Sequence, residues 1–202
     1  GVPLMKIVTE AIESAAQEKA AEWIRREVFE HEWKCKVANP VTPDVKKVLH
    51  LLARLHPCGD PIATLSVVET TGNTILHSNF EISVGENATI ARYTQLAVLK
   101  PYRGLHVAAT LVQEALLQCA SEHKFDYTWL LFNAARAQSS SLCRFLGFEA
   151  SDKIFQSEFG SMRVLLRKES NCDIPRGRTP THDYFPAFRE TPSDRGVYTK
   201  II

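Results

Sequence analysis

The stretch LAVLKPYRGLHVAATLVQEAL, residues 96–116, joins a strand pattern to a helix pattern through one tight corner. A helix that begins directly after a strand exposes backbone N–H groups, and its dipole adds positive character at that end. Such a corner binds phosphate when small residues allow a close approach. Gly104 and Ala108 are small and Arg103 carries a full charge, so the corner predicts a pyrophosphate site. The small residues would serve helix–sheet packing equally well, and the Walker and three-glycine dinucleotide patterns are both missing.

The segments around this corner alternate between strand and helix patterns. Strands are expected at 4–9, 48–55, 62–69, 75–83, 88–99 and 127–132, with two more around 151–156 and 162–167. Helical spacing runs from about Thr9 to Trp33, from the corner to about His123, and through 139–147. Hairpins in the first half and crossovers in the second predict an α/β (α+β) fold with a mixed sheet.

Composition excludes several classes of protein. Lys and Arg number 24 against 23 Asp and Glu, a formal charge of +1, so no global field attracts nucleic acid or an anionic membrane. The five cysteines are widely spaced and form no CxxC pair, which indicates neither a disulfide framework nor a metal site. No apolar run reaches the roughly 18 residues of a membrane span. We therefore expect a cytoplasmic protein.

The 202 residues suit one domain, which we place at 1–168. Residues 169–202 are rich in proline and charge and have no sustained period, so they are expected to form a tail. The tail's aromatic residues are too many for a solvated coil, and they predict packing on the body or on the neighbouring subunit of a homodimer. They are Tyr184, Phe185, Phe188 and Tyr198.

Residues 103–108, RGLHVA, resemble the acyl-CoA-binding motif of the GCN5-related N-acetyltransferase (GNAT) superfamily, which reads Arg or Gln, two residues, Gly, one residue, Gly or Ala. Downstream, NAARAQSSSLCRFLGFEAS resembles its second signature, with Asn133 after a strand and a closing Gly147-Phe148. The order of elements over 4–168 also matches. The resemblance implies a mixed sheet whose middle strands splay apart, and acetyl-CoA or another acyl-CoA as donor to an amine.

The resemblance also implies which residues hold the donor. Backbone amides of Leu96, Ala97 and Val98, on a bulged strand, would contact the thioester and pantetheine arm. The pyrophosphate would lie on the amides from Arg103 to Ala108, and Asn133 belongs to the second signature. The corner residues implied are Arg103, Gly104, Leu105, His106, Val107 and Ala108.

Two positions depart from the family pattern. His106 stands where the motif has its first glycine, so its ring either crowds the phosphates or donates a hydrogen bond to them. Cys143 stands where many members have the Tyr that protonates the leaving thiolate. A thiol has suitable acidity for that role, although a lone Cys on an apolar helix face is more often a buried hydrophobe.

Attack by an amine needs a proton acceptor near the splayed strands. We predict Glu81, on the strand expected at 75–83, as this base. Strict alternation places Ala91, Tyr93, Gln95 and Ala97 on one strand face, where Tyr93 and Gln95 would contact the acceptor. Phe29 and Trp33 end the first helix, which in many members flanks the acceptor pocket.

Two alternatives remain open. The sequence more loosely resembles the acyl-homoserine-lactone synthases and the long-chain N-acyl amino acid synthases, which take acyl chains from acyl carrier protein. The substituted glycine and tyrosine also fit a member that binds acyl-CoA without catalysing transfer. The acceptor is either a small-molecule amine or a protein amine.

Overall fold

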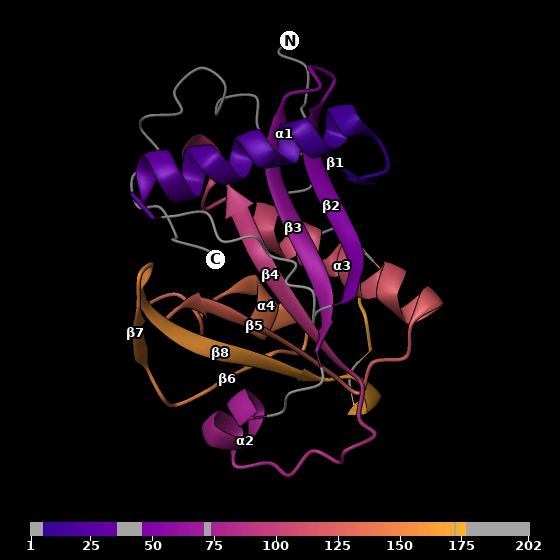
Figure 1. The fold of residues 1–202 in the computed structure, drawn as a ribbon, viewed down its shortest axis with the longest axis vertical. Helices are drawn as coiled ribbons and strands as arrows, with labels where there is room; N and C mark the ends of the chain where they lie inside the picture. Colours follow the sequence, from indigo (N-terminus) through magenta and orange to yellow (C-terminus); the bar gives the residue numbers. More distant parts are fainter. Residues whose placement is uncertain (1–5, 36–45, 71–73, 172, 177–202) are drawn as a thin grey trace.

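The computed structural model describes residues 6–35, 46–70, 74–171 and 173–176 (Figure 1). The N-terminal half contains β1 (Lys6–Ala11), α1 (Ala15–Arg25), the π-helix η1 (Arg26–Glu32), β2 (Lys46–His56), β3 (Pro61–Thr70), α2 (Thr74–Phe80) and β4 (Ile90–Val98). The second half contains η2 (Lys100–Tyr102), α3 (Val107–Glu122), β5 (Tyr127–Asn133), α4 (Ser141–Phe145), β6 (Glu149–Ala150), β7 (Phe155–Ser157), β8 (Gly160–Lys168) and η3 (Glu169–Asn171).

The described strands form one mixed sheet, as the sequence predicts. Its order is β1-β2-β3-β4-β5-β8-β6, with β7 paired to β8. All neighbours are antiparallel except β4 and β5, which run parallel. The parallel pairing extends from Ile90 opposite Tyr127 to Tyr93 opposite Leu130 and then stops. The last five residues of β4 therefore part from β5, which confirms the predicted splay.

An extra residue in β4 lies at this parting point. On the neighbouring strand β3, Thr64 pairs with Ala97 of β4 and Ser66 pairs with Thr94 of β4. An advance of three residues along β4 therefore matches an advance of two residues along β3. Gln95 lies inside this bulge and has a left-handed φ of 51°. A bulge of this kind bends the strand and shifts its side-chain alternation by one.

The helices cover the sheet from both sides. α3 packs on one face, in the large core that includes Leu51, Leu65 and Tyr93. On the other face α1 packs over Leu52 and Ala97. α2 lies on that same face near the start of β4, at the lower end of the molecule in Figure 1. The end of β4 that leads to α3 is therefore its upper end.

Two predicted elements differ in the structure. The strand predicted at 75–83 is wrong, because residues 74–80 form α2; Leu76 and Phe80, one helical turn apart, both pack in the cluster around Trp129. The helix predicted from Thr9 begins later, since β1 continues to Ala11 and Ser14 caps α1 in a capping box with Gln17.

The chain after β8 begins by packing on the body. The Arg167 guanidinium donates to the Asp173 carbonyl at 2.8 Å, and the Gln113 amide donates to the Pro175 carbonyl at 2.7 Å. The tail aromatics at 184–198 lie outside the described residues.

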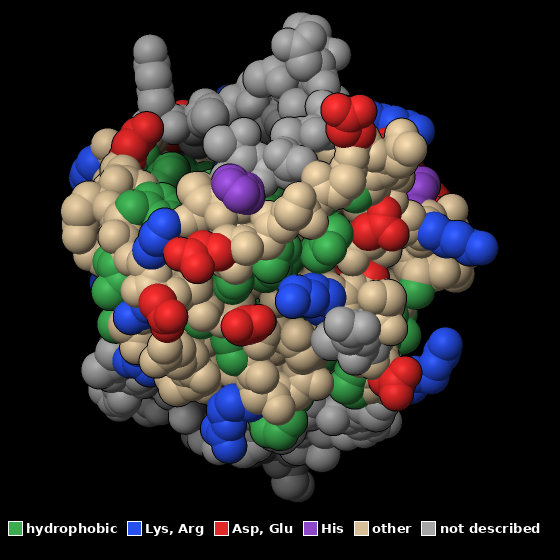
Figure 2. Space-filling view, turned by 90° about the horizontal axis from the view of Figure 1, so that it is seen from below, with side chains coloured by type: hydrophobic (Ala, Val, Ile, Leu, Met, Phe, Trp, Pro, Cys, Tyr) green, Lys and Arg blue, Asp and Glu red, His purple; other side chains and the backbone are tan. Residues whose placement is uncertain are grey.

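The surface reflects the balanced composition. On the face shown in Figure 2, acidic and basic side chains are interspersed, and neither sign gathers into a continuous patch. Among the described residues, no helix has the length and apolar character needed to cross a membrane.

A buried histidine fastens α1 to the sheet. His50 on β2 is 5% exposed; its Nε2 lies 2.9 Å from an Arg25 nitrogen and its Nδ1 lies 3.3 Å from a Glu18 oxygen. Burial, reinforced by the charges of Lys47 and Arg25, lowers the pKa of His50 to about 4. The ring is therefore neutral in the folded protein at neutral pH.

This arrangement predicts an acid-sensitive fold. Between pH 6.5 and about 4 the unfolded chain binds a proton at His50 that the folded chain excludes, so stability falls as the pH is lowered, by at most about 1.4 kcal/mol per unit. Urea unfolding from pH 7.5 to 4.5 should show this slope, and His50→Gln should reduce it. The matched variant is His31→Gln, on exposed His31. Equal slopes in wild type and His50→Gln would contradict the assignment.

Candidate functional site

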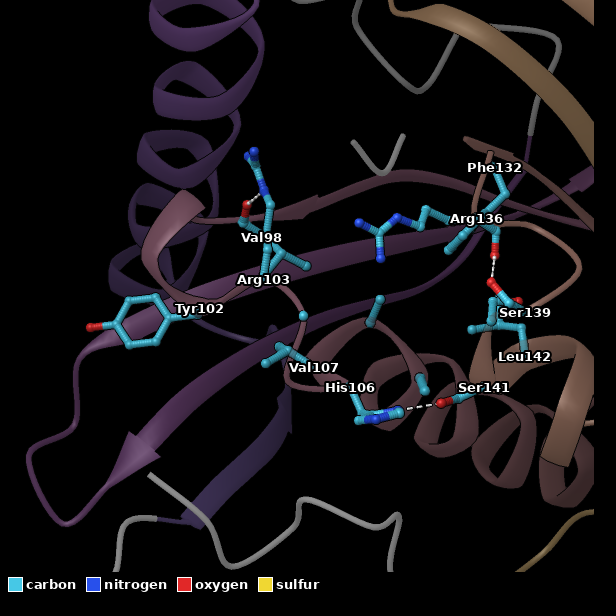
Figure 3. A pocket seen from close by; sticks show the side chains of 14 residues that line it. Val98, Tyr102, Arg103, His106, Val107, Phe132, Arg136, Ser139, Ser141 and Leu142 are labelled. Carbon is cyan, nitrogen blue, oxygen red and sulfur yellow. Dashed lines mark hydrogen bonds between the residues drawn. The ribbon is translucent and has the colours of Figure 1, made fainter. Parts of the chain in front are cut away.

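A cavity of about 210 Å³ lies between the start of α3 and the start of α4 (Figure 3). None of the described residues that line it is acidic. The lining residues are Val98, Tyr102, Arg103, Gly104, His106, Val107, Ala108, Ala109, Phe132, Arg136, Ser139, Ser140, Ser141 and Leu142. The corner predicted from residues 96–116 therefore forms one wall of a cavity, and the segment after β5 forms the other.

Arg136 supplies the cationic charge of this cavity. In Figure 3 its side chain extends from the segment after β5 toward the corner. The residue is half-buried, and its guanidinium makes no hydrogen bond or ion pair within the described parts of the chain. Together with the N–H groups of the first turn of α3, it makes the cavity suitable for an anion.

His106 occupies the helix start in the left-handed conformation, with φ of 60°. This backbone geometry favours glycine, the residue expected here from the motif that residues 103–108 resemble. The His106 ring turns to α4, where its Nδ1 makes a hydrogen bond with the Ser141 hydroxyl. Burial, with a smaller effect of Arg144, lowers the pKa of His106. The ring thus links α3 to α4 and forms part of the cavity wall.

Arg103 also contributes to the wall, but its guanidinium is directed away from the cavity (Figure 3). The side chain is 1% exposed and is paired through both terminal nitrogens with the Glu32 carboxylate. Its Nε donates to the Val98 carbonyl at 2.8 Å, and its guanidinium carbon lies 5.5 Å from the centre of the Trp33 ring. The sequence-based expectation placed this charge beside the phosphate amides; the structure places Arg136 there instead.

The predicted faces of β4 are wrong beyond Gln95, because the bulge shifts the alternation of side chains by one residue. Leu96 and Val98 lie in the core under α3 together with Ala91 and Tyr93, whereas Ala97 faces α1. Tyr93, predicted to contact the acceptor, is 1% exposed, and burial raises the pKa of its hydroxyl well above 10. It lines a different cavity, beneath the end of α3.

Gln95, the other polar residue predicted on β4, is 8% exposed and occupies the bulge itself. Leu96, Ala97 and Val98 follow it at the parting of β4 from β5, where their amides were predicted to act.

Leu105, predicted at the corner, is buried in the core and does not line the cavity. Cys143 and Asn133 are not lining residues either. Cys143 packs against the core, and burial raises the pKa of its thiol. Asn133 accepts a hydrogen bond from the Ala135 amide at 3.1 Å, so it shapes the turn that carries Arg136.

An aromatic cluster lies beside Ala97 on the α1 face. Phe29 and Trp33 come from the π-helical segment and its end, and Phe159 comes from the turn between β7 and β8. Their ring centres are 5.5 to 5.7 Å apart. The predicted acceptor residues Phe29 and Trp33 are thus brought to the splayed end of β4.

Glu81 is remote from these groups. It is exposed and directly follows α2, which lies at the lower end of the molecule, whereas β4 and β5 part above α2 (Figure 1). The strand on which its role depended is a helix, so the structure offers no support for Glu81 as the base.

Sequence reasoning missed three contributors to this region: Glu32, Arg136 and Phe159. Arg136 stands three residues after Asn133 in the quoted second signature, and this proximity was its only signal. No local sequence pattern marks Glu32 or Phe159, because the residues that they contact are distant in the sequence. Across the described ranges, no three His, Cys, Asp or Glu side chains gather as a metal ion would require.

No protein-family model matches the chain, and no curated protein matches its sequence. Solved structures do match. FeeM, an N-acyl amino acid synthase from uncultured soil microbes, is 17% identical, with a TM-score of 0.60 over 81% of this chain and 91% of FeeM. The chain has the GNAT fold.

Two further structures agree with this fold. An acyl-CoA N-acyltransferase from Pseudomonas aeruginosa is 17% identical, with a TM-score of 0.54 over 81% of this chain and 99% of that protein. Arabidopsis thaliana NAA60, solved in complex with acetyl-CoA, is 14% identical, with a TM-score of 0.55 over 81% of this chain and 99% of NAA60. The fold expected from residues 4–168 is therefore confirmed.

The ion pair between Glu32 and Arg103 predicts a measurable loss of stability. Glu32→Gln leaves a buried guanidinium with a neutral partner, and breaking such a pair costs about 3 kcal/mol or more in unfolding free energy. Glu22→Gln is the matched variant, because Glu22 pairs with Arg26 on the exposed side of α1, where a pair is worth about 0.5 kcal/mol or less. Urea denaturation of both variants measures the difference. Equal losses would contradict the buried role of Glu32.

Proposed function

We propose that this protein is an N-acyltransferase that binds acyl-CoA at the α3–α4 cavity and transfers the acyl group to an amine. The observation that carries the proposal is the half-buried Arg136, without a partner in the described chain, facing the first turn of α3 beside the parting of β4 and β5. A cation and helix N–H groups that converge on one cavity suit a pyrophosphate.

In this proposal the corner amides from Gly104 to Ala108 and the Arg136 guanidinium hold the pyrophosphate. The pantetheine arm would lie where β4 and β5 part, with those amides of the stretch Leu96, Ala97 and Val98 that point away from β3 directed at the thioester. Donors placed toward a developing oxyanion stabilise the tetrahedral transition state by several kcal/mol. Holding donor and acceptor together supplies the rest through proximity and orientation.

The amine would attack the thioester carbon directly, form the new C–N bond and expel the thiolate of coenzyme A. Its proton would leave through water, because the structure gives no support to Glu81 as the base. Burial keeps the Cys143 thiol protonated at neutral pH, but the residue lies outside the cavity lining. We therefore propose that water also protonates the departing thiolate.

Thermal unfolding with free coenzyme A, acetyl-CoA and a long-chain acyl-CoA tests the donor. Each ligand should raise the melting temperature, since a ligand at about 100 times its dissociation constant adds about 2.7 kcal/mol. A larger shift with one acyl chain would indicate the preferred length. No shift with any of the three would contradict the proposal and favour a carrier-protein donor.

The Arg136 assignment predicts a specific loss of affinity. Arg136→Gln should weaken coenzyme A binding about 10-fold or more, because a hydrogen bond to a charged group is removed, while the melting temperature without ligand changes little. Calorimetric titration measures the dissociation constant. Arg144→Gln is the control, since Arg144 is exposed on α4 and does not line the cavity. Similar weakening in both variants would point to general charge rather than to a site at Arg136.

A further inference from the structure

A second cavity, of about 610 Å³, lies beneath the end of α3 and shares no described lining residue with the α3–α4 cavity. α3 has 16 residues, so a helix about 24 Å long separates the two cavities. The other walls of the second cavity come from β4, the start of β5 and the segment that follows β8. The proposed acyl transfer uses none of its lining residues.

Two side chains that line this cavity have buried polar atoms without hydrogen bonds. Tyr93 is 1% exposed, and its hydroxyl lies beside the Cys119 thiol, a weak hydrogen-bonding group, without forming a hydrogen bond of ordinary geometry. The Glu169 carboxylate contacts Arg167 and Thr128, but its Oε1 is buried and has no hydrogen-bond partner. Leaving buried polar atoms unpaired is costly, so the pair indicates a partner that enters the cavity.

The two unpaired atoms are suited to one kind of polar group. A phenol hydroxyl can donate or accept a hydrogen bond, whereas a carboxylate oxygen only accepts. Burial raises the pKa of Tyr93, and the charge of Glu169 adds to this effect, so the two groups lie within electrostatic range of each other. A hydroxyl group on a ligand can accept from Tyr93 and donate to Glu169, which would satisfy both atoms.

The rest of the cavity suits an apolar body. Leu116, Phe125 and Ile174 line it and also pack in the core under α3. The Phe125 ring is stacked with the His123 ring, with their centres 5.7 Å apart, so one wall is aromatic.

The charges around the cavity favour an uncharged ligand. The charged lining residues, together with the Arg167 partner of Glu169, comprise three basic and three acidic side chains, namely Lys124, Arg167 and Arg176 with Asp126, Glu169 and Asp173. An ammonium group would meet as many cations as a carboxylate would meet anions. Neither sign of charge is therefore favoured.

We propose that this cavity is a second small-molecule site, for an uncharged ligand that carries a hydroxyl group on an apolar or aromatic body. The hydroxyl would lie between Tyr93 and Glu169, and the body would lie against Leu116, Phe125 and Ile174. Tyr93 is the last residue of β4 that pairs with β5, so the ligand would contact this strand just before its parting. The site does not depend on the proposed acyl transfer.

Phenol and toluene test the role of the hydroxyl, because they have nearly the same shape and only phenol can form both hydrogen bonds. Burial of apolar surface alone favours toluene. We expect wild type to bind phenol about 10-fold or more tightly than toluene, and Tyr93→Phe to weaken phenol binding about 10-fold while leaving toluene binding unchanged. NMR titration of the full chain measures both dissociation constants and locates the site, with shifts expected at the end of α3.

Tyr127→Phe is the matched variant, because Tyr127 is a partly buried strand tyrosine that does not line this cavity. It should leave phenol binding unchanged. Since the Tyr93 hydroxyl has no partner in the free protein, Tyr93→Phe should not lower the melting temperature without ligand. A lower melting temperature would show that the hydroxyl already has a partner, which would contradict the inference.

Four other results would overturn the inference. They are equal binding of phenol and toluene by wild type, phenol binding that Tyr93→Phe leaves unchanged, tighter binding of benzylamine or benzoate than of phenol, and no phenol binding at all, which would mean that water alone fills the cavity. Titration of phenol in the presence of saturating coenzyme A separates this site from the proposed donor site. An unchanged dissociation constant supports a separate site, and competition would place phenol in the α3–α4 cavity and refute it. A failure of coenzyme A to bind would remove the proposed function and leave this inference standing.

Discussion

One extra residue in β4 determines the geometry of the whole site. The bulge at Gln95 reverses the alternation of side chains, so Leu96 and Val98 enter the core under α3 while Ala97 turns to α1. The strand bends where its pairing with β5 ends. Backbone groups that an ordinary parallel pair would use between strands thereby become available to a ligand. The cavity at the start of α3 and the aromatic cluster beside Ala97 both lie next to that parting.

The two sides of the site are joined by one buried ion pair. Glu32 ends the π-helical segment that carries Phe29, and it holds Arg103 at the corner before α3. The Trp33 indole donates to the same carboxylate at 3.1 Å. π-Helical turns are rare and recur at functional sites. Here the π-helical segment carries Phe29 and, through Glu32, contacts the corner before α3, so this one segment connects the aromatic cluster to that corner.

The buried and half-buried arginines differ in how their charge is balanced. Arg136 faces the first turn of α3, and Arg92 lies on Trp129 across the sheet. Neither is neutralised within the described chain, whereas Arg103 and Arg167 are buried and paired. The contrast separates arginines whose charge is balanced within the fold from arginines whose charge is not balanced among the described residues.

Local sequence patterns predicted the fold well, because the corner at 96–116 and the Gly147-Phe148 pair are continuous in sequence. These patterns failed where contacts between residues distant in the sequence determine the local structure. Residues 75–83 read as a strand, but Leu76 and Phe80 pack on Trp129 as a helix. The charge of Arg103 was expected at the phosphate site, and only the contact with Glu32, 71 residues away, redirects it. The bulge at Gln95 inverted the faces of β4 for the residues that follow it. The periodicity of the sequence alone could not locate this bulge.

A crystal structure of the protein with coenzyme A tests the account most directly. We expect the pyrophosphate within hydrogen-bonding distance of the amides between Gly104 and Ala108 and of the Arg136 guanidinium. The pantetheine arm should enter between β4 and β5 and reach the amides that follow Gln95. Coenzyme A bound elsewhere, or a pantetheine arm that does not enter at the parting of β4 and β5, would contradict the account.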